Sequence, residues 1–189
     1  MSYTRDLTPN LRNSLQLLYQ THPTESMKCV EIGSYEGGGS VVIHDILCNH
    51  PNSILYCIDP FDDIYVKGKP EMSFWDEPCK GQYGRFKTNT QHLSKIVELK
   101  GTSDVMIPTL EENSLDFAYI DGDHSPEQVY KDIVNVFPKM KKNSIVLFDD
   151  YLWEMNGIVT KPGVDKFLEE YKGSYELLFQ NWQLALRKL

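Results

Sequence analysis

Four residues in the second half of the chain have types and spacing that suit acid–base or metal chemistry. Asp121 and His124 share one Asp-Gly-Asp-His run, and Asp149 and Asp150 are adjacent further on. Both groups follow apolar runs that predict buried strands, so neighbouring strands would bring the carboxylates close together. Carboxylates this close repel one another unless protons or a cation compensate. Oxygen donors with no nearby cysteine favour Mg²⁺ or Mn²⁺, and the predicted ligands are Asp121, Asp149 and Asp150.

An alternative for the adjacent pair is that Asp150 caps the following segment while Asp149 faces solvent. The histidine has a pKa range that suits removal of a proton from a substrate hydroxyl near neutral pH. A metal beside it would lower the pKa of that hydroxyl as well. Histidines before helices are more often surface or capping residues, so a catalytic role for His124, with Asp121, is a hypothesis.

A glycine-rich stretch in the first half of the chain has the pattern of a ligand-binding loop. It follows an apolar run at 27–33 and precedes the helical spacing of 41–47. A strand that breaks on glycines into a helix start leaves free N–H groups beside a nucleotide-sized cleft. Tyr35 stands where the dinucleotide pattern needs its second glycine, and Glu31 lies two residues before the first. These departures favour S-adenosylmethionine over NAD, bound by Glu31, Gly33, Ser34, Tyr35, Gly37 and Ser40.

Further cofactor contacts are expected at the ends of the next predicted strands. Asp59 ends the apolar run 53–59, and a carboxylate there can accept hydrogen bonds from two ribose hydroxyls. The alternative is that Asp59 and Pro60 simply start a turn. Ser103 follows the run 96–101 and could line an adenine pocket, although a turn alone explains it equally well. Asp121 is the remaining predicted cofactor contact.

The elements that must position these residues alternate between strand and helix patterns. This alternation predicts an α/β fold: a doubly wound, mostly parallel seven-stranded sheet with an antiparallel C-terminal hairpin. We expect a single domain over 1–189. The predicted helices are 8–20, 41–47, one that begins at Ser125, and 163–171. The predicted strands are 27–33, 53–59, 96–101, 115–121, 144–149, 175–180 and 182–187.

One long connection, from Pro60 to Gln91, lacks a clear pattern of either kind. Such connections are uncommon in compact domains unless they are functional or disordered. Phe74, Trp75 and Tyr83 make plain disorder less suitable as an explanation. We predict a partly helical flap near the substrate.

Composition narrows the class of protein. The chain has 189 residues, enough for one full core, and its net charge of -8 argues against nucleic acid as a partner. Its four cysteines form no Cys-x-x-Cys pair, so we expect a reduced, cytoplasmic protein. The start of the chain has no apolar signal core, and no apolar run approaches membrane-spanning length. No membrane partner is expected.

Taken together, the motifs resemble those of class I S-adenosylmethionine-dependent methyltransferases. The resemblance is carried by 30–33 with Gly37-Gly38, then 58–61, 119–124 and 147–151. The last two are most similar to small metal-dependent O-methyltransferases of the macrocin and mycinamicin sugar type, with catechol O-methyltransferase more distant. The resemblance implies methyl transfer to a sugar hydroxyl. It also implies methionine binding by the loop with Glu31, ribose binding by Asp59, a metal on the three aspartates, and His124 as the base.

Other functions stay open at this point. A metal-independent N- or C-methyltransferase would use the acids only to shape its pocket, and a non-catalytic module would bind the cofactor without turnover. An NAD-dependent oxidoreductase is disfavoured by the glycine pattern. The expected partner is a small-molecule or glycan acceptor of unidentified structure. The sequence leaves open a homo-oligomer and a chain that is one domain of a longer polypeptide.

Overall fold

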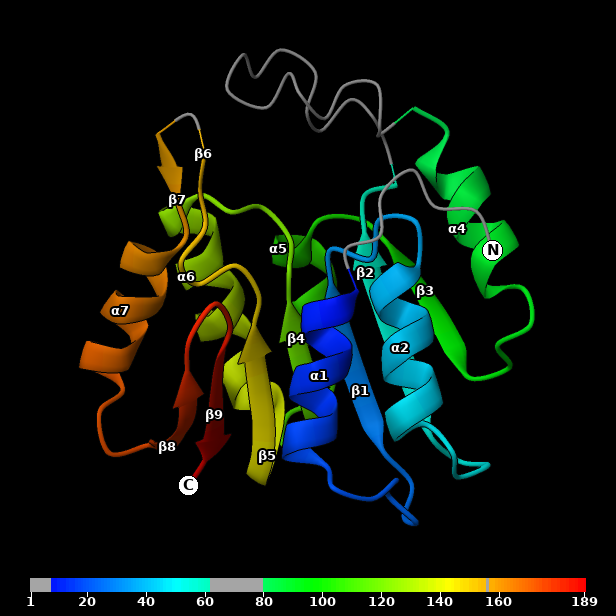
Figure 1. The fold of residues 1–189 in the computed structure, drawn as a ribbon, viewed down its shortest axis with the longest axis horizontal. Coiled ribbons are helices and arrows are strands. Elements are labelled where there is room, and N and C mark those ends of the chain that lie inside the picture. The colour runs from blue at the N-terminus through cyan, green and yellow to red at the C-terminus, as the bar shows by residue number, and fades with distance from the viewer. Residues whose placement is uncertain (1–7, 62–79, 156) are drawn as a thin grey trace.

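The protein, described from a computed structural model over residues 8–61, 80–155 and 157–189, is built on one seven-stranded sheet. The strand order is β3-β2-β1-β4-β5-β9-β8, and the first five of these strands are parallel (Figure 1). Strand β9 is antiparallel to both β5 and β8, which confirms the predicted fold class with its closing hairpin. The bounds are β1 Lys28–Ile32, β2 Ile54–Asp59, β3 Ile96–Lys100, β4 Leu115–Ile120, β5 Met140–Phe148, β8 Tyr175–Gln180 and β9 Leu184–Lys188.

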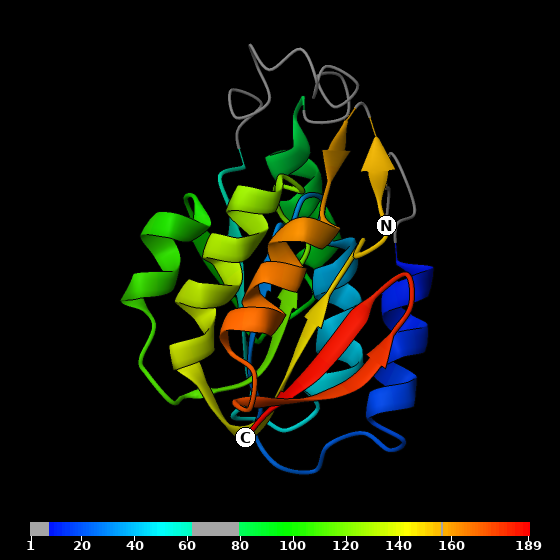
Figure 2. The same cartoon turned by 90° about the vertical axis from the view of Figure 1, so that its left-hand side faces the viewer.

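Helices cover both faces of this sheet, as Figures 1 and 2 show. The helices α1 (Pro9–Leu18), α2 (Gly38–Leu47) and α4 (Gln82–Thr90) pack on one face. The opposite face carries α6 (Pro126–Val136) and α7 (Lys161–Glu170), with the short α5 (Ser103–Met106) beside them. Each face has its own buried apolar cluster, so the central strands between them are buried on both sides and are largely continuous apolar runs.

The local sequence explains where α6 begins and which of its faces is buried. In α6, Pro126 occupies the first turn, where a missing N–H costs nothing, and Glu127 favours the positive end of the helix. Val129, Ile133 and Val136 follow at intervals of three and four and are buried. The sequence-based prediction of a helix at this position is confirmed.

The carboxyl ends of the central strands lie side by side at one edge of the sheet. The N–H of Asp121, just after β4, donates to the carbonyl of Ile32 at the end of β1, at 2.9 Å. Likewise, the N–H of Asp149 donates to Ile120 at 3.0 Å. Chain connections leave β1 and β4 in opposite directions, which opens a crevice at this edge in parallel sheets.

The structure adds detail to two of the predicted connections between strands. A short hairpin of β6 (Glu154–Met155) and β7 (Ile158–Val159) follows β5 and was not predicted. The predicted flap is helical where α4 forms, and its part at 62–79, with Phe74 and Trp75, lies outside the described residues. Within the described ranges, no helix has the length and apolar character to cross a membrane.

Candidate active site

The glycine loop after β1 is a turn in which three residues, two of them glycines, have positive φ angles. Gly33, Tyr35 and Gly37 have φ angles of +88°, +46° and +82°, a region that L side chains rarely adopt. The Gly37 N–H closes the turn on the carbonyl of Ser34 at 2.7 Å. A Cβ atom on Gly33 would overlap the carbonyl oxygen of Asp121, so the loop lies directly against the end of β4. Its last residues lead into the N-terminus of α2, which suits an anion.

Glu31 and Ser40, both predicted to contact the cofactor, contact each other beneath this loop. The Ser40 hydroxyl donates to the Glu31 carboxylate, which is only 1% exposed. Burial raises the pKa of Glu31 to about 7, although the hydrogen bond from Ser40 opposes this. A Cβ atom on Gly39 would overlap Glu31 Oε1, so the carboxyl group lies under the start of α2. The pair therefore supports the loop from below.

Asp59, the predicted ribose ligand, faces the glycine loop from the end of β2. Its Oδ2 accepts the Tyr35 N–H at 2.9 Å, and its Oδ1 accepts the Phe61 N–H at 2.6 Å and the Gln82 side-chain amide at 3.0 Å. Burial raises the pKa of Asp59, and the two backbone donors oppose the increase. Gln82, on α4, was not anticipated from the sequence. The carboxylate is thus held between the glycine loop and α4.

Ser103 is directed toward helix α6. Its hydroxyl donates to Asp132 Oδ1 at 2.6 Å and lies 3.2 Å from the Gln128 side-chain amide. Asp132 is 1% exposed, and burial raises its pKa to about 7, partly offset by hydrogen bonds from Ser103 and Gln128. The predicted adenine-lining residue therefore also ties α5 to α6.

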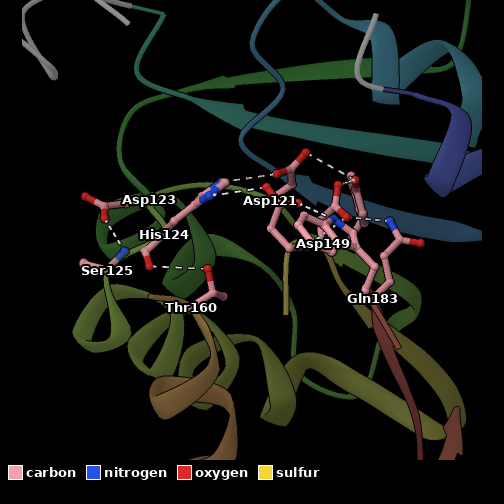
Figure 3. A network of polar contacts seen from close by, with 10 residues as sticks. Asp121, Asp123, His124, Ser125, Asp149, Thr160 and Gln183 are labelled. Atoms are coloured by element: carbon pink, nitrogen blue, oxygen red, sulfur yellow. Dashed lines mark hydrogen bonds and ion pairs between the residues drawn. The ribbon is translucent and has the colours of Figure 1, made fainter. Parts of the chain in front are cut away.

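The structure brings Asp121, His124 and Asp150 together at the ends of β4 and β5. One donor atom from each lies within 4.8 Å of the others. The imidazole stands between the two carboxylates, with Nε2 at 3.5 Å from Asp121 Oδ1 and Nδ1 at 3.5 Å from Asp150 Oδ2. Figure 3 shows His124 pointing toward Asp121. The ring of Trp153 packs edge-on against the imidazole, with the centroids 4.7 Å apart.

Local contacts fix the segment that carries this histidine. Asp123 Oδ1 accepts the N–H of Ser125 at 2.8 Å, just before α6 begins. Just before α7, the Thr160 hydroxyl approaches the carbonyl of His124 at 3.5 Å (Figure 3). The side chain of His124 therefore projects from a short, braced connection between β4 and α6.

Burial and mutual repulsion dominate the electrostatics of this group. The pKa of Asp121 is raised to about 8, first by burial and then by the charge of Asp149, while His124 opposes the shift. Burial and Asp149 also raise the pKa of Asp150. For His124, burial lowers the pKa, but the hydrogen bond and charge of Asp121, with the charge of Asp150, outweigh it and leave the value raised. A proton or a cation relieves the repulsion among these carboxylates, and two carboxylates with a neutral imidazole fit a divalent cation.

Asp149, the third predicted metal ligand, lies outside this group. It is 9% exposed, and both of its carboxylate oxygens accept hydrogen bonds from the protein. Oδ1 accepts the Gln183 amide at 2.7 Å and the Asp150 N–H at 2.9 Å, and Oδ2 accepts the Tyr119 hydroxyl at 2.5 Å. The geometry therefore groups His124, in place of Asp149, with the other two predicted ligands.

A buried ion pair joins the glycine loop to α4, and sequence reasoning missed it. The Glu36 carboxylate, 1% exposed, accepts a hydrogen bond from the Arg85 guanidinium. The Asn89 amide donates to the carbonyl of Glu36 at 3.0 Å. The available signal was an acid inside a glycine loop, since a buried carboxylate needs a donor or a cation from elsewhere.

Three features define a class I methyltransferase fold. They are the strand order, the glycine turn between β1 and α2, and the acids at the ends of successive strands. Residues 30–151 match the family described as a methyltransferase domain, which covers more than half of the chain. The chain belongs to this family and is a methyltransferase, with S-adenosylmethionine as the methyl donor.

Two solved structures share this fold, and one curated protein is similar in sequence. NovP, an O-methyltransferase, is 17% identical with a TM-score of 0.67, over 95% of this chain and 78% of that one. TomG, an O-methyltransferase from Streptomyces achromogenes solved with S-adenosylmethionine, is 14% identical with a TM-score of 0.63, over 95% of this chain and 79% of that one. The uncharacterized protein R132 of Acanthamoeba polyphaga mimivirus is 26% identical over 167 residues, 85% of this chain and 68% of that protein. The structural likenesses show the fold and leave the acceptor to be argued from the site.

Proposed function

We propose that the protein transfers a methyl group from S-adenosylmethionine to a hydroxyl oxygen of a sugar, with a divalent cation orienting the acceptor. The sugar hydroxyl comes from the resemblance of 119–124 and 147–151, and one observation supports a cation beside the donor: the backbone of Gly33 lies against the carbonyl of Asp121. The predicted donor loop is thus in main-chain contact with the first residue of the group formed by Asp121, His124 and Asp150. A hydroxyl held at that group would lie next to a methyl donor held by the loop.

The chemistry follows from the roles of these side chains. The acceptor oxygen forms a bond to the methyl carbon, the sulfur–carbon bond breaks, and S-adenosylhomocysteine leaves. Asp59 and the glycine loop bind and orient the donor, so that the reaction gains from proximity. His124 in its neutral form takes the hydroxyl proton. The neutral form of His124 increases as the pH rises, and the rate should rise with it; because neighbouring carboxylates raise the pKa of His124, this increase falls at higher pH than for an ordinary histidine.

The carboxylates of Asp121 and Asp150 would hold the cation, and His124, which has a donor atom within 4.8 Å of theirs, is either the base or a third ligand. A bound divalent cation lowers the pKa of a hydroxyl and fixes its direction. Mg²⁺ or Mn²⁺ suits carboxylate donors, and an imidazole among them favours Mn²⁺ over Mg²⁺. If His124 binds the cation, it cannot also take the proton, and the two roles separate in the experiment below.

The test is formation of S-adenosylhomocysteine from S-adenosylmethionine with methyl glycosides and with catechol, in Mn²⁺ and in excess chelator. We expect turnover with a glycoside that is lost in chelator. Turnover that survives chelator would favour the metal-independent alternative, and binding of S-adenosylmethionine without turnover of any acceptor would favour a non-catalytic module. A His124→Gln variant that binds Mn²⁺ normally but turns over slowly, with a flattened pH–rate profile, would identify the base. Loss of Mn²⁺ binding in that variant would identify a ligand.

A further inference from the structure

The carboxylate that is predicted to bind the donor's ribose has most of its acceptor positions filled by the protein. Oδ1 of Asp59 accepts two hydrogen bonds, from the Phe61 N–H at 2.6 Å and from the Gln82 side-chain amide at 3.0 Å. Oδ2 accepts one, from the Tyr35 N–H at 2.9 Å. A carboxylate has about four lone-pair positions, two on each oxygen. One position is therefore left for a ligand, and it lies on Oδ2.

The fold fixes the two backbone donors to Asp59. Tyr35 and Phe61 have φ angles of +46° and +50°, which residues with side chains rarely adopt, and each directs its N–H at this carboxylate. The two hydroxyls of a ribose are both donors. Asp59 can accept one of them without losing a hydrogen bond from the protein, so the other hydroxyl needs a different acceptor.

Gln82 has a suitable acceptor next to Asp59. Because an ionised carboxylate can only accept hydrogen bonds, the amide faces Asp59 with Nε2, and Oε1 on the same carbon stays available. Within the residues that the structure describes, no hydrogen bond to Oε1 is found, although Gln82 is only 5% exposed. An amide oxygen that is nearly buried normally has a donor, and a ribose hydroxyl would supply one.

Helix α4 holds Gln82 in this place. Gln82 is the first residue of the helix, and the last turn of the same helix packs on the glycine loop. There the Asn89 amide donates to the carbonyl of Glu36 at 3.0 Å, and a Cβ atom on Gly37 would lie 2.6 Å from Thr90 Cγ2. The helix is thus in contact with both elements that are predicted to bind the donor, the glycine loop and the end of β2.

We infer that Gln82 is a second ribose-binding residue: one hydroxyl of the ribose donates to Asp59 Oδ2 and the adjacent hydroxyl donates to Gln82 Oε1. Nε2 of Gln82 keeps its hydrogen bond to Asp59 Oδ1. The inference rests on S-adenosylmethionine as the methyl donor and on Asp59 as its ribose ligand, and it is independent of the acceptor and of the cation. It adds α4 to the donor site and lets Gln82 distinguish a ribose from a deoxyribose.

The experiment measures the binding of S-adenosylhomocysteine and of its 2′-deoxy and 3′-deoxy analogues to the full chain by isothermal titration calorimetry. The wild type should bind each analogue at least about threefold more weakly than S-adenosylhomocysteine, because each lacks one hydrogen bond. Gln82→Met keeps the length of the side chain and should bind S-adenosylhomocysteine about 3–10-fold more weakly than the wild type. It should also bind one of the two analogues as tightly as S-adenosylhomocysteine, because the acceptor of the missing hydroxyl is gone.

Asn89→Leu is the matched control, since it removes another amide that ties α4 to the glycine loop. Any loss of affinity in this variant should be the same for all three ligands. The inference is overturned if Gln82→Met binds S-adenosylhomocysteine as tightly as the wild type or more tightly, because the glutamine would then only occupy the place of a hydroxyl. It is also overturned if Gln82→Met weakens all three ligands by one factor, because its role would then be structural.

These outcomes are separate from those of the proposed function, since neither an acceptor nor Mn²⁺ is present in the titrations. A wild type that binds all three ligands equally well would overturn the inference and leave the proposed acceptor and cation untouched. Urea denaturation without ligand shows whether each variant is folded before affinities are compared. If Gln82→Met does not fold, Gln82→Ala takes its place with the same expected results.

Discussion

The buried carboxyl group of Asp132 predicts a pH-dependent part of the stability that one substitution should remove. Asp132 is 1% exposed beneath the loop after β4, and its Oδ2 has no hydrogen-bond partner among the residues that the structure describes. Burial raises its pKa from 3.8 to about 7 in the folded protein. Below the unfolded pKa both states hold the proton, so this group causes no penalty there.

The sign and size of the effect follow from this shift. As the pH rises through the interval between the two pKa values, the unfolded chain loses the proton while the folded protein keeps it, and folding becomes less favourable. At about 1.4 kcal/mol per pKa unit, the full penalty above pH 7 is about 4 kcal/mol. The asparagine of Asp132→Asn cannot ionise. Its free energy of unfolding should therefore rise, relative to that of the wild type, by about 3 kcal/mol between pH 5 and pH 8.

The assay is urea denaturation of both proteins at several values across that pH range. The asparagine oxygen can still accept from Ser103 and Gln128, while its amide at the Oδ2 position costs about 1–3 kcal/mol at every pH. The ionisation of Asp132 is therefore reported only by how the difference in unfolding free energy between the two proteins changes with pH. Asp104→Asn, at an exposed position of the same network, controls for removal of a charge. A difference between wild type and Asp132→Asn that stays constant from pH 5 to pH 8 would refute the reasoning.

Two further substitutions test the glycine loop and its attachment to α4. Gly33→Ala places a Cβ against the Asp121 carbonyl at a φ of +88°. We therefore expect the free energy of unfolding to fall by at least about 2 kcal/mol in denaturation, and S-adenosylmethionine binding to be lost in calorimetry. Wild-type affinity in this variant would contradict the close approach. Arg85→Met removes a guanidinium that donates to the buried Glu36 carboxylate, and because Arg85 is 27% exposed we expect a loss of about 2–3 kcal/mol in the free energy of unfolding, below the cost of breaking a fully buried pair. Adding Glu36→Gln should recover part of that loss, and no recovery would show that the pair is not coupled.

The sheet and its flanking helices were predictable because local patterns and burial agree. Parallel strands covered on both faces are continuous apolar runs, and all seven strands of the main sheet were expected from such runs or from the hairpin pattern. The start of α6 was readable from Ser125, Pro126 and Glu127. The hairpin of β6 and β7 was not, since its strands have two residues each and carry no periodicity.

At the site, the sequence predicted which strand ends matter but not how each side chain points. Asp149 and Asp150 are adjacent and identical, so no local rule separates a carboxylate that turns into a buried network from one that faces the cation group. The difference arises in part from Gln183, which reaches Asp149 from the last strand of the chain. In the same way Gln82 reaches Asp59 from α4. Such partners depend on tertiary packing, and their sequence positions carry no signal.

This contrast also explains why the methyl donor is easier to infer than the acceptor. The donor side is built from backbone: positive φ angles at Gly33 and Gly37, and a glycine pressed against the carbonyl of Asp121. Few residues satisfy such constraints, so they leave a readable pattern. Beyond the cation group, the neighbouring surface consists of side chains such as Trp153 and Trp182, carried on connections between strands. Connections accept many sequences without cost to the sheet, so selection for a particular acceptor can change them while the donor half stays fixed.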